Sequence, residues 1–203
     1  MSDRGRYIAF EGAEGCGKST QAARLASSIH AVLTRETGGT EIGARLREIL
    51  HDTSVNHLTP RAEALITAAD RAQHISEIVH PALDKGRTVV SDRSVHSSIA
   101  YQGYGRELDI DTIRRLNDWA TGGLWPDVVV FLDTPDEVIA ERMSRRNLDR
   151  FEAAGRAFHE RVIHGFRQMA AADPDHWITV EAVGTIDQVS EKIHLTLAER
   201  GIL

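Results

Sequence analysis

The chain has 203 residues and a formal net charge of −6, and 41% of its residues are hydrophobic and 27% are charged. These proportions are those of an ordinary globular protein of about one domain. The acidic balance argues against a protein that coats nucleic acid. Cys16 is the single cysteine, which excludes an intrachain disulfide. No apolar run has the length of a membrane span, and the first residues lack the apolar core of a signal peptide. We therefore expect a soluble cytoplasmic protein.

Five short segments, in chain order, have the composition of strands in a parallel sheet. They are residues 7–11 (YIAFE), 31–35 (AVLTR), 88–92 (TVVSD), 127–133 (DVVVFLD) and 177–181 (WITVE). All but the second are nearly continuous apolar runs, which is typical of strands that are buried on both faces.

Helical patterns fill the intervals between these segments. Thr59 and Pro60 provide an N-cap and a first-turn proline for a long helix that we expect Pro81 to end. Asp109 and Thr185 stand at the N-cap positions of two later helices. The alternation predicts an α/β fold in which a five-stranded parallel sheet is flanked by helices on both faces. We expect a single domain over residues 1–203.

The stretch between the first strand and the first helix has the pattern G-x-x-x-x-G-K-S. In this position the glycines let backbone N–H groups surround phosphates, and the helix N-terminus adds partial positive charge. Lys18 reaches the β- and γ-phosphates, and the Ser19 hydroxyl binds Mg²⁺. The pattern predicts a P-loop NTPase fold that binds ATP and Mg²⁺ through Gly12, Ala13, Glu14, Gly15, Cys16, Gly17, Lys18, Ser19 and Thr20.

Several classes of protein share this loop. A GTPase switch needs an N-K-x-D motif, and the nearest match, at residues 147–149, lacks the lysine. ATPase motors are usually longer than this chain. A kinase for a small molecule needs a second, arginine-rich site that faces the γ-phosphate. One short stretch is rich in arginine, which on an acidic chain favours binding of one small anion; it holds Arg142, Arg145, Arg146 and Arg150.

Five ordered motifs resemble those of the thymidylate kinases, which make dTDP from dTMP and ATP. The motifs are FEGAEGCGKSTQ (residues 10–21), TRETGGT (34–40), AADRAQH (68–74), DRSVHSSIAYQG (92–103) and LDRFE (148–152). The resemblance runs from about Ile8 to Val180, which is nearly the whole chain. It implies the activity, substrate and cofactors of that family.

The resemblance implies an acceptor site that is centred on Arg93. Arg93 matches the arginine that holds the acceptor phosphate, with Arg35 as a second contact, and a forked guanidinium suits a phosphate. Glu14 matches a carboxylate that faces the 3′-hydroxyl of the acceptor sugar. Tyr101 matches the aromatic residue beneath the deoxyribose. The base is expected to meet Arg71, Ser98 and Gln102.

The resemblance also implies how the transferred phosphoryl group is handled. Asp92 matches the carboxylate that organises Mg²⁺ with Ser19, through water. Residues 142–153 match a short mobile lid, in which Arg150, with Arg145 or Arg146, closes over the phosphoryl group. The expected catalytic residues are then Lys18, Asp92, Arg93 and Arg150, and Arg142 is expected to contact ATP. Members of the family are commonly homodimers, so we expect a homodimer here, with no binding to nucleic acid or membrane.

One substrate position departs from the family pattern. Thr67 stands where the family usually has the Phe or Tyr that stacks on thymine, four residues before Arg71 on the same helix face. Without that ring we expect a raised KM for dTMP or another acceptor nucleotide. Two alternatives therefore stay open beside a thymidylate kinase. They are a kinase for another (deoxy)nucleoside monophosphate and a regulatory protein that binds nucleotide without turnover.

Overall fold

The computed structural model describes residues 4–55, 57–143 and 150–203. Its strands are β1 (Tyr7–Glu11), β2 (Val32–Arg35), β3 (Val89–Asp92), β4 (Val128–Asp133) and β5 (Trp177–Glu181). Its α-helices are α1 (Lys18–Ser28), α2 (Glu41–His51), α3 (Pro60–His74), α4 (His80–Asp84), α5 (Val95–Ser98), α6 (Ile110–Thr121), α7 (Asp136–Met143), α8 (Arg156–Ala172) and α9 (Ile186–Glu199). Two π-helical segments, η1 (Ile75–Val79) and η2 (Ile99–Gly105), and a short 3₁₀ segment, η3 (Glu152–Ala154), complete the described elements.

The five strands form one parallel sheet in the order β2-β3-β1-β4-β5, which confirms the predicted α/β fold. Asp92 pairs with both Arg35 and Phe10 in the sheet register. The loops that follow β1, β2 and β3 therefore leave the same edge of the sheet. The carboxyl ends of parallel strands at such an edge are where open α/β sheets bind ligands.

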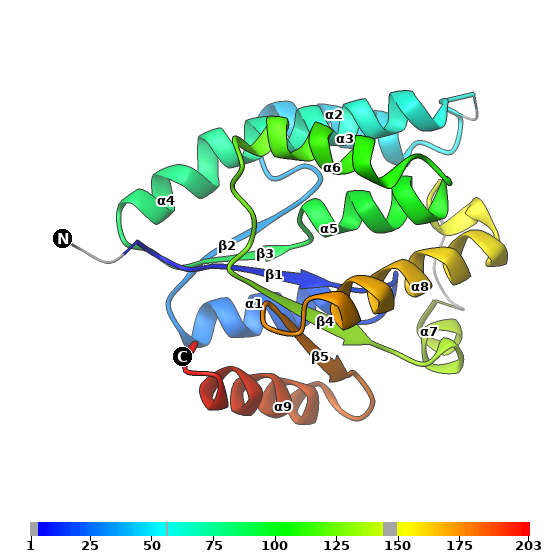
Figure 1. Cartoon of the computed structure of the whole chain (residues 1–203). Coiled ribbons are helices and arrows are strands. Elements are labelled where there is room, and N and C mark those ends of the chain that lie inside the picture. The colour runs from blue at the N-terminus through cyan, green and yellow to red at the C-terminus, as the bar shows by residue number, and fades with distance from the viewer. Residues whose placement is uncertain (1–3, 56, 144–149) are drawn as a thin grey trace.

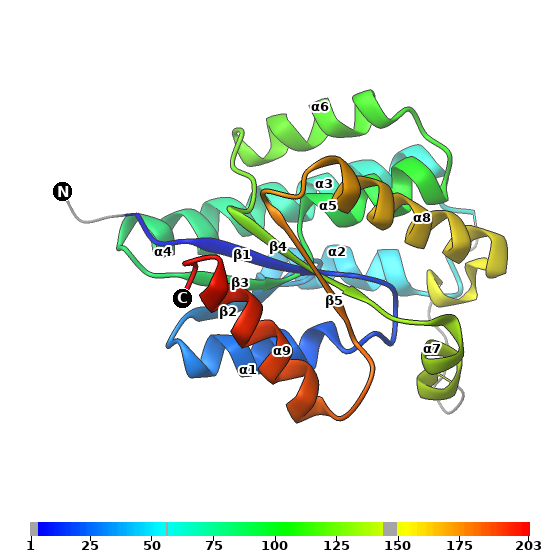
Figure 2. The same cartoon turned by 60° about the horizontal axis from the view of Figure 1, so that its bottom comes forward.

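Helices cover both faces of the sheet (Figure 1). α1 and α9 pack on one face, against strand residues that include Ile8, Phe10 and Val130. α6 and α8 lie on the other face, where Phe131 and Trp177 point. The alternation of neighbouring residues between the two cores follows from the two-residue period of a strand. Figure 2 shows the same layers from a second direction.

The long helix that begins at Pro60 does not end at Pro81. It passes through η1 and continues as α4 to Asp84, so the expectation that Pro81 ends it is wrong. Proline lacks an N–H and normally interrupts an α-helical ladder. Here the turn just before it widens to a π-helix, which shifts the hydrogen-bond register where the proline N–H would be missing.

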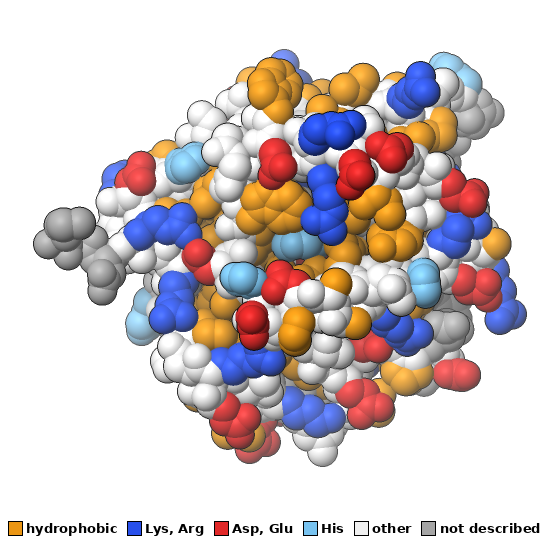
Figure 3. Space-filling model, in the orientation of Figure 1, with side chains coloured by type: hydrophobic (Ala, Val, Ile, Leu, Met, Phe, Trp, Pro, Cys, Tyr) orange, Lys and Arg blue, Asp and Glu red, His pale blue; other side chains and the backbone are white. Residues whose placement is uncertain are grey.

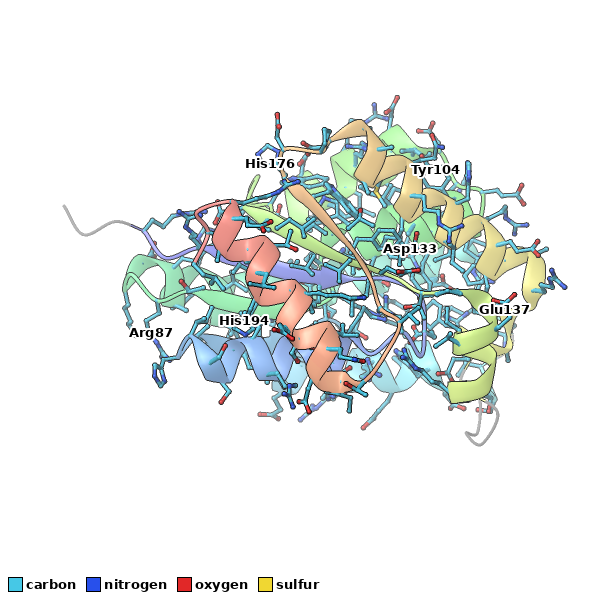
Figure 4. All side chains as sticks on the ribbon, turned by 90° about the horizontal axis from the view of Figure 1, so that it is seen from below. Arg87, Tyr104, Asp133, Glu137, His176 and His194 are labelled. Atoms are coloured by element: carbon cyan, nitrogen blue, oxygen red, sulfur yellow. The ribbon has the colours of Figure 1, made fainter. Side chains whose placement is uncertain are left out.

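An ion pair and a hydrogen bond tie neighbouring elements to one another. Asp133, at the end of β4 and labelled in Figure 4, accepts from Arg167 of α8 at Nε (3.0 Å) and Nη2 (2.9 Å). His194, also labelled there, joins α9 to α1 through Ser28 (Nε2 to Oγ, 3.1 Å).

Among the described residues, the structure contains no helix that is long and apolar enough to cross a membrane.

His96 is a buried histidine in α5, with its ring edge-on to the indoles of Trp125 and Trp177 (5.2 and 4.9 Å between ring centroids). Burial, aided by the positive charges of Arg114 and Arg71, lowers the pKa of His96 from 6.5 to about 3. The imidazole is therefore neutral in the folded protein throughout the physiological pH range.

Replacing His96 by glutamine is expected to reduce the loss of stability in mild acid. In the unfolded chain His96 binds a proton near pH 6.5, whereas in the folded chain it stays neutral down to about pH 3. The neutral, buried imidazole therefore contributes its full stability above pH 6.5, and this contribution is lost as the pH falls. His96 should thus lower the free energy of unfolding by about 1.4 kcal/mol per pH unit below pH 6.5. Denaturant unfolding between about pH 5 and pH 7 measures this slope. Glutamine in place of the exposed His80 serves as the control, and equal slopes in both variants would refute the prediction.

Candidate active site

The glycine loop after β1 is shaped by backbone conformations that favour glycine. Gly12, Gly15 and Gly17 have φ values of 147°, 73° and 99°. A Cβ at Gly12 would lie 2.8 Å from the carbonyl oxygen of Leu132, so no larger residue fits there. The loop thus turns its backbone around an open centre and leads into the N-terminus of α1.

Lys18 begins α1 with a buried side chain that folds back along the loop. Its Nζ donates to the carbonyl oxygen of Ala13 (2.7 Å) and lies 3.6 Å from Sγ of Cys16. The ammonium group is therefore positioned by the loop itself, at the edge of the cavity described below.

Ser19 and Asp92 lie together at the carboxyl edge of the sheet. Ser19 Oγ donates a short hydrogen bond to Oδ2 of Asp92. Oδ1 of Asp92 is buried and has no hydrogen-bond partner among the residues that the structure describes. A hydroxyl and a carboxylate with an unused oxygen form a donor set that fits Mg²⁺.

Arg93 follows β3 in a left-handed backbone conformation (φ 77°), which is strained for a residue with a side chain. Its Nη2 donates to Oε1 of Glu14 and to the hydroxyl of Tyr101 (3.1 Å), and its Nη1 donates to Oγ of Ser97 (3.0 Å). The guanidinium also lies 4.9 Å from the centre of the Tyr101 ring. Burial by itself would lower the pKa of Arg93, but Glu14 and the other negative groups around it raise that pKa well above its usual value.

Glu11 holds the segment after Arg93 in place, a role that the sequence analysis missed. Its buried carboxylate accepts from the backbone N–H and hydroxyl of Ser94 (2.8 and 2.7 Å) and from those of Ser97 (3.2 and 2.6 Å). Burial raises the pKa of Glu11, although Arg93 and the two serines act to lower it. A charged residue at the end of an otherwise apolar strand was the signal in the sequence.

Arg71 crosses the interior from α3 with its side chain fully buried. Its Nε donates to Glu36 (2.7 Å), its Nη1 to Ser98 Oγ (2.8 Å) and to Asn117 Oδ1, and its Nη2 to the carbonyl oxygen of Ser94 (2.9 Å). These bonds use every N–H of the guanidinium except one on Nη2. Burial would raise the pKa of Glu36, but Arg71 and His74 outweigh it and lower that pKa. Arg71 is thus rigidly fixed, with one donor left.

A cavity of about 420 Å³ joins the glycine loop to Arg71. Every residue that the sequence analysis assigned to the acceptor site lines this cavity, namely Glu14, Arg35, Thr67, Arg71, Arg93, Ser98, Tyr101 and Gln102. Gly15, Gly17, Lys18, Ser19, Thr20, Asp92 and Arg142 line it as well. Arg47, Leu50 and His51 also line it and had not been predicted, and so do Phe151 and Glu152, which fall within the predicted lid.

The arginines of the predicted lid are in different situations. Arg142, on α7, donates from Nη1 to the carbonyl oxygen of Cys16 (3.1 Å) and so lies beside the glycine loop. Arg150 donates from Nε to the carbonyl oxygen of Leu50 (2.7 Å), and its Nη1 lies 2.8 Å from Oε2 of Glu63. Arg150 is not one of the described residues that line the cavity. Arg145 and Arg146 lie outside the described residues, as does the rest of 144–149.

Comparison with known proteins agrees with this geometry. The family model described as thymidylate kinase matches residues 10–193. A thymidylate kinase of Nitratidesulfovibrio vulgaris is 45% identical over 200 residues, covering 92% of this chain and 93% of that protein. One from an Exiguobacterium species is 40% identical over 195 residues, covering 93% and 92%. The crystal structure of thymidylate kinase from Ehrlichia chaffeensis matches with a TM-score of 0.79 at 30% identity, over 96% of this chain and 99% of that one. This chain belongs to the thymidylate kinase family.

Proposed function

We propose that this chain transfers the γ-phosphoryl group of ATP to dTMP, giving dTDP and ADP, with the help of Mg²⁺. Membership of the family makes the chain a nucleoside monophosphate kinase. The observation that carries the proposal is that one cavity joins the glycine loop, with Lys18, to the fixed guanidinium groups of Arg93 and Arg71. Phosphoryl transfer needs two anions held in line with the charge between them neutralised, and this cavity brings cationic groups to that place.

On the donor side, we assign the triphosphate of ATP to the glycine loop and Lys18. The loop N–H groups and the start of α1 neutralise phosphate charge through fixed dipoles. Ser19 and Asp92 would hold Mg²⁺, which supplies electrostatic stabilisation of the phosphate oxygens. Arg142, which donates to the carbonyl oxygen of Cys16 and lines the cavity, would contact the nucleotide there.

On the acceptor side, we assign the phosphate of dTMP to Arg93 and Arg35. Arg93 is pre-oriented by Glu14 and Ser97, so less conformational entropy is lost when it binds an anion. Glu14 would face the 3′-hydroxyl of the sugar, and Tyr101 would lie beneath the deoxyribose. The base would reach Arg71, Ser98 and Gln102, which line the same cavity.

A coupled assay of ADP release over a panel of nucleoside monophosphates tests the acceptor assignment. We expect dTMP to give the highest kcat/KM. Preferential turnover of another monophosphate would favour a relative with a different acceptor. Tight ATP binding without turnover of any acceptor would favour a regulatory protein.

Phenylalanine in place of Thr67 is expected to lower the KM for dTMP by about tenfold, because stacking of a base on an aromatic ring is worth about 1–3 kcal/mol. Thr67 lines the cavity and presents no ring, and its hydroxyl donates instead to the carbonyl oxygen of Glu63 (2.9 Å). Steady-state kinetics of wild type and variant measure the effect. Thr67→Leu fills similar space without a ring and should give a smaller gain. An unchanged or higher KM in Thr67→Phe would refute the stacking argument.

We also propose that the chain is one domain with a lid near residues 142–153 and that it works as a cytoplasmic homodimer without binding nucleic acid. Exposed apolar side chains on α2, α3 and α6 support the dimer, and they are Ile42, Ile49, Leu65 and Trp119.

On the face in Figure 3, basic and acidic side chains are interspersed. That face lacks the broad positive field with which proteins attract nucleic acid.

A further inference from the structure

Glu63 is a fully buried carboxylate on α3, one helical turn before Thr67. Its Oε1 accepts from Nε2 of Gln102 (2.9 Å). Its Oε2 accepts from Nη2 of Arg106 (3.0 Å) and lies 2.8 Å from Nη1 of Arg150. One carboxylate therefore joins α3 to η2 and to two guanidinium groups.

The contact with Glu63 determines which way the amide of Gln102 faces. A carboxylate oxygen only accepts hydrogen bonds, so the amino end of the amide must point toward it. The oxygen of the amide, Oε1, is then turned away from Glu63. Oε1 is buried and finds no donor in the described part of the chain, and Gln102 lines the cavity. An unpaired buried acceptor is costly, so its donor is expected from a bound ligand.

Two guanidinium groups pair with the carboxylate of Glu63. Arg106 contacts both carboxylate oxygens through Nε (3.3 and 3.2 Å), and Arg150 adds a second positive charge. Breaking a buried charge pair leaves an uncompensated charge in a low-dielectric site. The arrangement therefore holds the Gln102 amide in one of its two possible orientations.

The orientation of Gln102 matters for the choice of base. Thymine and uracil carry an N–H at N3, whereas neutral cytosine has an unprotonated acceptor nitrogen there. A fixed amide oxygen can accept the N3–H of thymine or uracil. With cytosine it would face the N3 acceptor, and two acceptors form no hydrogen bond. Arg71 lines the same cavity, and the N–H on its Nη2 that no described residue accepts can donate to a ring carbonyl. Sites with fixed polar groups reject a mismatched ligand because those groups stay unpaired.

We propose that Glu63 is a positioning residue that sets base specificity by holding the Gln102 amide with its oxygen toward the cavity. The proposal rests on the proposed function, since it takes a nucleoside monophosphate as the acceptor. Glu63 itself is not among the described residues that line the cavity. A merely structural Glu63 would affect stability and all acceptors alike, whereas a positioning residue changes the ratio between acceptors.

The test is the ratio of kcat/KM for dTMP to that for dCMP in Glu63→Gln. A glutamine at position 63 can donate to Oε1 of Gln102, which lets that amide turn its amino end to the cavity. The ratio is expected to fall by about tenfold or more, mainly through a higher KM for dTMP, because each unmatched buried hydrogen-bonding group costs about 1–3 kcal/mol. Arg106→Gln is the matched control, because it also removes a charge from this cluster but leaves the Glu63 oxygen facing Gln102. The dTMP to dCMP ratio of Arg106→Gln should stay within about twofold of wild type, which is a smaller change than one unmatched hydrogen-bonding group would cause.

A double-mutant cycle separates the route through Gln102 from any other. In a Gln102→Leu background, Glu63→Gln should no longer change the dTMP to dCMP ratio. If thermal unfolding shows that Glu63→Gln does not fold, Glu63→Asp replaces it. Glu63→Asp keeps the charge but withdraws the oxygen by one methylene, and a smaller fall in the ratio is expected.

The outcomes are distinguishable from failure of the proposed function. A wild type that does not turn over dTMP would overturn the proposed function. A wild type that prefers dTMP, with an unchanged ratio in the folded Glu63 variant, would overturn only the role of Glu63. If Glu63→Gln still lowered the ratio in the Gln102→Leu background, that result would likewise overturn only the role of Glu63.

Discussion

Alanine in place of Arg93 is expected to lower kcat/KM for dTMP by about 10²- to 10³-fold, because loss of one partner of a buried, hydrogen-bonded charge pair costs about 2–5 kcal/mol. Arg93 is the cation to which we assign the acceptor phosphate, and it is already oriented by Glu14, Ser97 and Tyr101. Its removal also takes away the guanidinium group that pairs with the carboxylate of Glu14 at the place to which we assign the phosphate. The donor site does not include this side chain, so the affinity for ATP should change little.

Steady-state kinetics with dTMP, together with an equilibrium titration of ATP, measure both parts of this prediction. Arg93→Lys is the matched control, since it keeps the charge but loses the forked geometry that binds a phosphate through two bonds. It should fall between the wild type and Arg93→Ala. A kcat/KM for Arg93→Ala within about threefold of wild type, less than about 1 kcal/mol, would contradict the assignment.

Alanine in place of Arg150 is expected to lower kcat on the order of 10³-fold, by analogy with arginines that stabilise phosphoryl-transfer transition states. The glycine loop has no basic residue before Lys18 and contains the acidic Glu14, so additional positive charge must come from outside it. Arg150 has a buried Nη2 without a partner among the described residues, and this nitrogen can still donate.

A control for Arg150→Ala must account for the salt bridge that Arg150 makes with Glu63. Arg150 and Arg106 each bring a guanidinium to this carboxylate. Arg106→Ala therefore removes the same kind of contact without removing the proposed catalytic charge. A kcat that falls far more in Arg150→Ala than in Arg106→Ala, with similar ATP affinity in both, supports a role in transfer. Equal small losses would mean that Arg150 only anchors Glu63 and that the charge comes from another residue.

Local physical chemistry accounts for the parts of the fold that the sequence predicted. Thr59, Asp109 and Thr185 each accept a backbone N–H in the first turn of the helix that follows, as their positions indicated. The apolar runs became the five strands, and three of them begin one residue later than expected, at Val32, Val89 and Val128. The expectation for Pro81 failed because the π-helical segment just before it, Ile75–Val79, accommodates the proline.

In the site, too, local motifs could be predicted from the sequence and long-range contacts could not. The glycine loop is a contiguous motif whose chemistry is local. The family resemblance, now confirmed by the comparisons, named acceptor-site candidates, all of which line the cavity. The groups that hold those residues could not be predicted. Asn117 and Glu36 both bind Arg71 from distant parts of the sequence, and Glu63 reaches Gln102 from another helix. Such pairs depend on how helices pack across the sheet, and no periodicity within one segment encodes that packing.

The most direct test of the account is to identify the product of the reaction. The protein is incubated with ATP, Mg²⁺ and dTMP, and the nucleotides are separated by chromatography, with Lys18→Met as the control that lacks the loop ammonium. We expect dTDP and ADP to form in equal amounts with the wild type, and far more slowly with the variant. Formation of ADP without dTDP, or binding of ATP with no dTDP formed, would contradict the assignment of this cavity to phosphoryl transfer onto dTMP.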